Sequence, residues 1–296
     1  MPLMNMHNGQ RASQGRVRSI PTDSLRLRTK RASKCGGAYT KGMEVVKVCG
    51  ITREEDAVEA CRNGAKLVGV IFAKGSKRRV TREQARRVVN AVRAFGEREG
   101  RVEVAREGGG GVKGMRRRTL GMNKRATRPL VVGVFQNDDM GEINDIVEDV
   151  GLDLVQLHGQ EGWEVAKECN VGVIRVVDVE ARAEGGAEGR ADKIINAIRE
   201  GPIAVLLDTS VKGVGGGAGV TFDWEVAKRV QAYGLPVIVA GGLDAENVRG
   251  MVKEVMPFGV DVSSGVEKEP GVKDKELVKI FLKEAQEGGV EGSMGI

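Results

Sequence analysis

The sequence predicts a single (β/α)8 TIM barrel, an α/β fold in which eight parallel strands alternate with helices. Eight short runs rich in Val, Ile and Leu recur along the 296 residues, and a helix-like segment follows each run. These units occupy roughly 220 residues, which is close to the usual size of such a barrel. An open doubly wound sheet is the alternative, but residues 49–52 after the first run lack the glycine pattern of a dinucleotide site.

The expected elements begin after residue 43 and follow one another in order. Strands are predicted at 45–49, 66–72, 130–135, 154–157, 173–177, 204–207, 236–240 and 259–262. Helices are predicted at 53–63, 81–95, 141–150, 161–169, 191–200, 222–232, 244–254 and 273–286. Thr52 and Glu55 have the spacing of a capping box for the first helix, and Thr81 is placed to open the second.

Positive charge is concentrated in two segments outside this alternation. Residues 1–43 carry a net charge of +8 and residues 97–128 one of +6, so the remainder carries −8 of the overall +6. Neither segment has an apolar periodicity, which predicts a disordered basic extension and a low-complexity insert that buries no face. The barrel is therefore expected over 44–287, interrupted by the insert and followed by a C-terminal tail at 288–296. Because the excess charge is peripheral, no specific nucleic-acid partner is predicted.

The basic extension permits two further interpretations. It could precede the true start at Met43, or it could be an organellar targeting arm, since it is rich in Arg and nearly free of acidic residues.

The cysteine and histidine content argues against a metal site. No two of Cys35, Cys49, Cys61 and Cys169 form a C-x-x-C pair, and His7 and His158 are the only histidines. No secretory segment is recognisable, so we expect reduced thiols in a cytoplasmic protein. No apolar run approaches the ~20 residues that a membrane-spanning helix needs, so no membrane association is predicted. Neither a metal nor a cofactor is expected.

Polar residues stand where the predicted strands end, which is where the active site of a barrel lies. Such a residue can also be a simple loop cap, so the set carries more weight than any one member. The set consists of Lys47, Cys49, Gln136, Asn137, Gln156, His158, Asp178, Asp208, Asp261, Ser263 and Ser264.

Three glycine-rich turns follow the last three strands. Backbone N–H groups that converge in such turns, together with helix N-termini, can bind a phosphate group. The alternative is that the glycines only permit tight turns, and three turns on neighbouring strands favour the phosphate site. Its candidates are Gly217, Gly219, Gly241, Gly242, Ser263, Ser264 and Gly265.

Two residues are candidates for acid–base chemistry. Lys47 and Cys49 are two positions apart on one strand and point the same way, and a nearby cation can lower the pKa of a thiol. Asp208 ends an apolar strand, where partial burial would raise the pKa of its carboxyl and suit it to act as an acid. The alternatives are a buried core cysteine and a carboxylate that caps a loop or forms a salt bridge.

With these residues in place, the chain resembles the phosphoribosylanthranilate isomerases of tryptophan biosynthesis. The resemblance spans residues 44 to about 283 in the order of that family. The matching segments are 47–52 (KVCGIT), 64–65 (GA), 69–72 (GVIF), 76–78 (SKR), 132–135 (VGVF) with Asn137, 155–159 (VQLHG), 206–209 (LLDT), 216–219 (GGAG), 222–224 (FDW), 240–243 (AGGL), 247–248 (NV) and 261–267 (DVSSGVE).

The resemblance implies a role for each candidate. Cys49 matches the general base and Asp208 the general acid of an Amadori rearrangement, which converts N-(5-phosphoribosyl)anthranilate to 1-(o-carboxyphenylamino)-1-deoxyribulose 5-phosphate without metal or cofactor. Arg78 matches the residue that binds the anthranilate carboxylate, and Asp261 a carboxylate near the substrate amine. Lys47 and His158 are expected at the substrate pocket, and the glycine and serine turns at the phosphate. The implied partner is this phosphosugar, bound by a monomer or homodimer.

The chain departs from the family pattern at Lys77, where Pro is usual, and at Ala218, where Thr or Ser is usual. Two other functions are compatible with parts of the sequence. The related histidine-pathway isomerase relies on an aspartate at the first strand, where Cys49 stands here. A non-catalytic protein that binds phosphosugars or nucleic acid would account for the basic segments, but not for the acid, base and phosphate candidates together.

Overall fold

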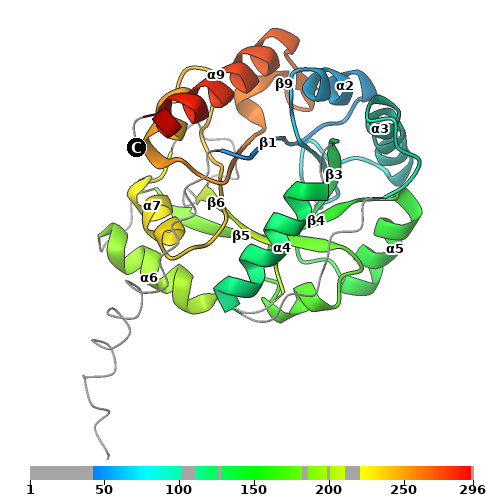
Figure 1. The fold of residues 1–296 in the computed structure, drawn as a ribbon. Helices are drawn as coiled ribbons and strands as arrows, with labels where there is room; N and C mark the ends of the chain where they lie inside the picture. Colours follow the sequence, from blue (N-terminus) through cyan, green and yellow to red (C-terminus); the bar gives the residue numbers. More distant parts are fainter. Residues whose placement is uncertain are drawn as a thin grey trace, which may run out of the picture. The chain divides into compact units, whose positions relative to one another are not determined.

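The computed structural model describes residues 43–101, 111–125, 128–181, 186–198, 201–210 and 221–294. The predicted disordered extension therefore lies, apart from Met43, outside the described residues. Eight parallel strands close into one barrel, with the last strand paired to the first, which confirms the predicted fold (Figure 1). The strands are β1 (Val45–Val48), β2 (Leu67–Ile71), β3 (Leu130–Phe135), β4 (Leu154–Leu157), β5 (Gly172–Glu180), β6 (Ala204–Ser210), β7 (Val237–Val239) and β8 (Gly259–Val262).

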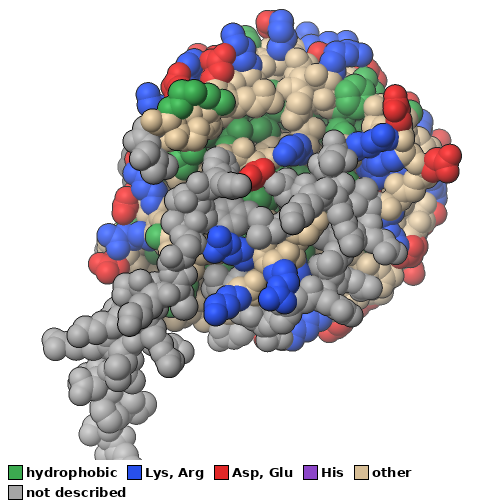
Figure 2. All heavy atoms as spheres, viewed as in Figure 1, with side chains coloured by type: hydrophobic (Ala, Val, Ile, Leu, Met, Phe, Trp, Pro, Cys, Tyr) green, Lys and Arg blue, Asp and Glu red, His purple; other side chains and the backbone are tan. Residues whose placement is uncertain are grey.

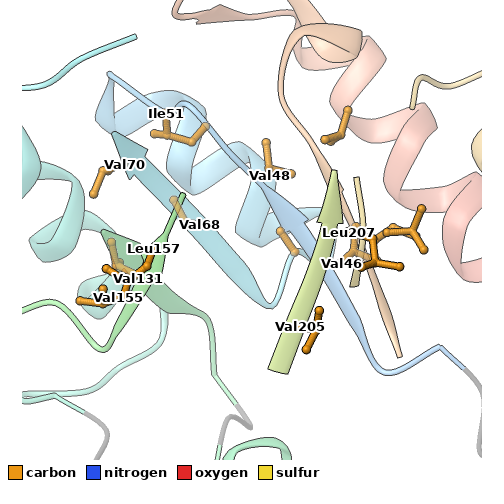
Figure 3. Packing of buried hydrophobic residues seen from close by; sticks show 14 of the residues in the cluster. Val46, Val48, Ile51, Val68, Val70, Val131, Val155, Leu157, Val205 and Leu207 are labelled. Carbon is orange, nitrogen blue, oxygen red and sulfur yellow. The ribbon is translucent and has the colours of Figure 1, made fainter. Parts of the chain in front are cut away.

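Alternate residues of each strand lie in two apolar layers, because successive side chains of a strand point to opposite faces. One layer fills the barrel interior and includes Val45, Leu67, Leu154 and Leu206. The other packs between strands and helices, and Figure 3 shows part of it. Strands buried on both faces must be apolar throughout, which is why the sequence predicts them.

Helices surround the barrel in the predicted order. They are α2 (Glu54–Arg62), α3 (Arg82–Phe95), α5 (Met140–Val150), α6 (Ala187–Ala197), α7 (Glu225–Ala232), α8 (Val248–Val255) and α9 (Lys275–Met294). Thr81 opens α3 as expected, in a full capping box with Gln84. The capping box predicted at Thr52 is wrong, because the Thr52 hydroxyl donates to the carbonyl of Gly271 at 2.5 Å and Arg53 is the N-cap of α2.

The helix predicted at 161–169 is only a 3-10 turn, η1 (Glu164–Lys167). Glu161 explains why the segment stays a loop. Its carboxylate accepts the N–H groups of Asn137 and Gly159 and pairs with Arg175 at 2.9 Å. These bonds fix the start of the segment between two strands instead of in a helical turn.

The predicted insert contains a helix, α4 (Gly111–Arg125), so the expectation that it buries no face is wrong. Met115 and Thr119 on this helix are completely buried. The Thr119 hydroxyl and the Arg118 guanidinium donate to the carbonyls of Ile203 and Pro202, just before β6 begins. Helix α4 thus lies against the N-terminal end of the barrel, across the face turned to the viewer in Figure 1.

The same end of the barrel holds a buried ion pair. Arg98 donates to both carboxylate oxygens of Asp153, at 2.8 and 2.6 Å, and to the carbonyl of Pro129 at 2.8 Å. Asp153 in turn accepts the N–H of Val131 on β3. Lys and Arg side chains are prominent on this face (Figure 2).

The C-terminal segment predicted as a tail is part of α9, which extends to Met294. Gly288, Gly289 and Gly292 are buried there, and a Cβ on Gly288 would lie 2.8 Å from the Arg249 carbonyl of α8. The glycines therefore permit two helices to pack closely. Between β8 and α9 come η2 (Ser264–Val266) and the small hairpin of β9 (Glu267–Glu269) and β10 (Val272–Lys273). In the described ranges, no helix combines the length and apolarity needed to span a bilayer.

Candidate active site

Lys47 and Asp261 form an ion pair inside the C-terminal end of the barrel. The two residues are register partners on β1 and β8, and Lys47 Nζ lies 2.9 Å from Asp261 Oδ2. Lys47 is completely buried. Burial disfavours the ammonium charge, but Asp261 and Cys49 outweigh it, so the pKa of Lys47 is raised and the side chain stays charged.

Cys49 follows on the same strand face, as the sequence predicted, and its thiol is buried. Burial raises the pKa of the thiol, and the Lys47 charge opposes this shift without reversing it. The expectation of a lowered pKa is therefore wrong. Gly69 on β2 makes room for the sulfur, since a Cβ there would lie 2.6 Å from Cys49 Sγ.

Asp208 and His158 face each other across the same end of the barrel. Burial raises the pKa of Asp208 to about 6, in the predicted direction, while His158 opposes the shift. His158 Nε2 lies 3.7 Å from Asp208 Oδ2 and 3.5 Å from Asp178 Oδ1. Burial lowers the pKa of His158, but the two carboxylates outweigh it and the net shift is upward.

Arg78 is held in a network that the sequence did not reveal. Its Nε and Nη2 donate to the two carboxylate oxygens of Glu267, at 2.8 and 2.7 Å. Lys273 Nζ donates to Glu267 at 2.8 Å and to the Ser263 carbonyl at 2.9 Å. Burial disfavours the Glu267 charge, yet Arg78 and Lys273 outweigh it and lower the pKa of that carboxyl.

Three buried polar atoms near this cluster have no hydrogen-bond partner within the described part of the chain. They are Asp261 Oδ1, Gln156 Oε1 and Ser263 Oγ. A buried polar atom without a partner is costly, so a site that leaves three of them unpaired is suited to a polar ligand.

The glycine and serine turns after β7 and β8 lie side by side. Gly241 and Gly242 have φ angles of +85° and +65°, which favour glycine. A Cβ on Gly265 would collide with the Leu243 carbonyl, so the turn that also contains Ser263 and Ser264 packs directly on its neighbour. Gly217 and Gly219, predicted for the same phosphate site, lie outside the described residues, as does Ala218.

Two residues of the predicted set have structural contacts instead. Gln136 donates to the His158 carbonyl at 3.2 Å, and the Asn137 side chain accepts the Gln160 N–H at 2.6 Å. Both join the loops after β3 and β4. Glu267 and Lys273 were missed as site residues, and the only signal for Glu267 was its place at the end of the 261–267 segment.

The fold and this cluster define the class of protein: a (β/α)8-barrel enzyme with its site at the C-terminal ends of the strands. The sequence profile of the N-(5′-phosphoribosyl)anthranilate isomerase family matches residues 46–106 and 113–284. The chain therefore belongs to this family, and phosphoribosylanthranilate isomerase activity in tryptophan biosynthesis follows from that membership. The histidine-pathway alternative is thereby excluded.

Two relatives illustrate the match. A tryptophan biosynthesis protein of Phytophthora nicotianae is 43% identical over 247 residues, which cover 81% of this chain and 46% of that protein. The chain thus spans about half the length of that relative. The N-(5′-phosphoribosyl)anthranilate isomerase of Dehalococcoides mccartyi is 36% identical over 247 residues, which cover 81% of this chain and 95% of the relative.

Solved structures agree. Phosphoribosylanthranilate isomerase from Thermotoga maritima superposes with a TM-score of 0.63 at 34% identity, covering 82% of this chain and 98% of that one. A phosphoribosylanthranilate isomerase in complex with reduced 1-(o-carboxyphenylamino)-1-deoxyribulose 5-phosphate superposes with a TM-score of 0.57 at 33% identity, with the same coverage of 82% and 98%.

Proposed function

We propose that the chain catalyses the Amadori rearrangement of N-(5-phosphoribosyl)anthranilate at this end of the barrel, with Asp208 as general acid and Cys49 as general base. The observation that carries the proposal is that one end of the barrel holds both a half-buried carboxyl with a raised pKa and a buried thiol beside a charged lysine. Asp208 lies on β6, and Cys49 directly follows β1, the strand that carries Lys47 of the Lys47–Asp261 ion pair.

Asp208 supplies the first proton. With a pKa of about 6, part of the population is protonated near neutral pH and can donate to the furanose ring oxygen. The C1′–O bond breaks, the ring oxygen becomes a hydroxyl, and the nitrogen lone pair forms a Schiff base at C1′. Asp208 is left as a carboxylate.

Cys49 removes the C2′ proton in the second step. The Schiff base that forms is cationic, and together with Lys47 it favours the thiolate over the thiol. The proton moves from C2′ to Cys49 Sγ, and the electron pair of the broken bond neutralises the iminium nitrogen as an enolamine. Tautomerisation moves a proton from the C2′ hydroxyl to C1′ overall and gives the ketose product.

Substrate binding uses the remaining groups. Arg78 is proposed to bind the anthranilate carboxylate; Glu267 occupies its Nε and Nη2, so Nη1 is left for the substrate. Asp261 Oδ1, which has no partner among the described residues, is proposed to accept the substrate amine N–H. The phosphate is proposed to bind at Gly241, Gly242 and 263–265, together with Gly217 and Gly219. His158 is proposed to lie beside the bound substrate.

A phosphosugar ligand is supported by the relative that was solved with the reduced product analogue. The oligomeric state is proposed as monomer or homodimer, since the Thermotoga maritima isomerase is described as dimeric. Neither a metal nor a redox cofactor takes part in the proposed steps.

The experiment is a fluorescence assay in which phosphoribosylanthranilate is consumed with and without the protein. We expect enzyme-dependent loss of substrate fluorescence that persists in excess EDTA and without added nicotinamide or flavin. Activity that disappears on chelation and returns with one divalent ion would overturn the proposed steps.

A further inference from the structure

Asp178 is a carboxylate at the C-terminal end of the barrel that the proposed reaction does not use. It is the register partner of Asp208, one strand away. Ile174 and Val176, four and two positions before it, belong to the interior layer of the barrel. Because side chains alternate along a strand, Asp178 also points toward the barrel axis, beside Asp208.

The imidazole of His158 lies between these two carboxylates. Its Nε2 is 3.5 Å from Asp178 and 3.7 Å from Asp208, and Asp178 is the nearer partner. One imidazole N–H can point at only one acceptor at a time, so the two carboxylates compete for it.

Hydrogen bonds fix the backbone that carries His158. The His158 N–H donates to the Phe135 carbonyl at 2.9 Å. Arg175 donates to the carbonyls of Leu157 and Gly159, on either side of His158, at 3.0 and 2.8 Å. Within the described part of the chain, the carboxylates of Asp178 and Asp208 are the charged groups that the ring nitrogen Nε2 faces.

We propose that Asp178 is a positioning residue for the isomerisation: its carboxylate holds the imidazolium of His158 in place beside Asp208. The proposal rests on the proposed role of Asp208 as the acid. Asp178 acts through His158 and does not touch the reacting atoms.

The charges around His158 support this arrangement. Asp178 and Asp208 favour its protonation, Lys47 disfavours it, and Asp261 lies close enough to interact with the imidazolium. The Asp178 side chain is 55% exposed and that of Asp208 only 21%. Water therefore helps to solvate the Asp178 charge, whereas Asp208 depends more on His158. Without Asp178, the imidazole loses its nearer anion.

The first test is an NMR titration of the free enzyme, which needs no substrate. The chain has two histidines, so the imidazole signals are few, and His158→Gln identifies the relevant one. We expect Asp178→Asn to lower the titration midpoint of His158 by about 1 in pH. Asp192→Asn, which removes an exposed carboxylate from α6, should leave it unchanged. An unchanged midpoint in Asp178→Asn would overturn the proposal, whatever the activity.

The second test is kinetic. We expect Asp178→Asn to lower kcat about fivefold at unchanged KM. The loss should be greater at pH 8 than at pH 6, because the lower titration midpoint of His158 in the variant removes more of the imidazolium at pH 8. Asp178→Glu should restore most of the activity, since it returns the charge. A lowered midpoint with an unaltered pH profile would overturn the positioning role. If the wild type lacks isomerase activity while the midpoint still falls, the reaction assignment fails and the ion pair stands.

Discussion

The two ends of the barrel use the same strands for opposite purposes. At the N-terminal end, charged groups face opposite charges or carbonyls: the two terminal nitrogens of Arg98 donate to Asp153, although its Nε has no hydrogen-bond partner among the described residues, and α4 donates to the carbonyls that precede β6. At the C-terminal end, a buried lysine, thiol and carboxyl stand together, and Asp261 Oδ1 has no partner in the described ranges. Buried groups of the second kind cost stability and permit chemistry, whereas those of the first kind stabilise the fold. Four experiments separate the two ends.

Removing the acid or the base should have the largest effect. We expect Cys49→Ala and Asp208→Ala each to lower kcat by about 10²–10⁴-fold, the usual contribution of a general acid or base. Circular dichroism should stay unchanged. Cys61→Ala, which removes a buried thiol from α2, is the matched control and should keep its activity. Near wild-type turnover in a folded Cys49→Ala or Asp208→Ala variant would refute the role of that residue.

A cavity at the other end should change stability alone. Met115 is completely buried on α4, and we expect Met115→Ala to lower the free energy of unfolding by about 2–5 kcal/mol, measured with urea. The kcat at 25 °C should not change. Lys113→Ala, at an exposed position of the same helix, should alter neither quantity. A wild-type free energy of unfolding in Met115→Ala would mean that the packing of α4 against the N-terminal end of the barrel does not stabilise the fold.

Arg78 should affect binding more than turnover. A charge-assisted hydrogen bond contributes about 1.5–3 kcal/mol, so we expect Arg78→Ala to raise KM about ten- to hundredfold with a smaller change in kcat. Glu267→Gln sharpens the test, because it removes the charge that holds the guanidinium and should raise KM by less. If KM is unchanged in Arg78→Ala, the carboxylate of the substrate is bound elsewhere.

The pKa of Asp208 predicts a stability cost at the active end. Its pKa is raised from 3.8 in the unfolded chain to about 6 in the fold, so the native state binds the proton more tightly and loses stability as the pH rises between these values. Asp208→Asn should therefore raise the free energy of unfolding at pH 7 by about 2 kcal/mol. This increase should vanish below about pH 4. Asp192→Asn serves as the control. If Asp208→Asn does not raise the free energy of unfolding at pH 7, burial does not disfavour the Asp208 carboxylate.

The strands were predictable because burial on both faces leaves a continuous aliphatic run. The site was predictable for a related reason: a period of two brings Lys47 and Cys49 to one face, and strand ends bring Asp208 and Asp261 to the same end of the barrel. Helix α4 was not predictable, since its burial depends on three side chains, Met115, Arg118 and Thr119, in a basic, glycine-rich segment.

Contacts over long sequence separations were also hidden. Arg78 and Glu267 are 189 positions apart, so nothing in the local pattern indicates that their side chains form a hydrogen-bonded ion pair. The raised pKa of Cys49 depends on how deeply the thiol is buried, and the sequence shows only that a lysine is near. The capping box at Thr52 failed likewise, because its hydroxyl is taken by the distant Gly271.

The ion pair between Lys47 and Asp261 has a consequence for how the protein is made. The two residues are 214 positions apart, on the strands that meet where the barrel closes. A ribosome adds about 5–20 residues per second, so Asp261 is synthesised about ten seconds or more after Lys47. A lysine cannot be buried alone at low cost, which keeps the first strand in water until the last one arrives. Closure of the barrel and assembly of the site are thus one late event, and nascent chains that end before residue 261 should have no isomerase activity.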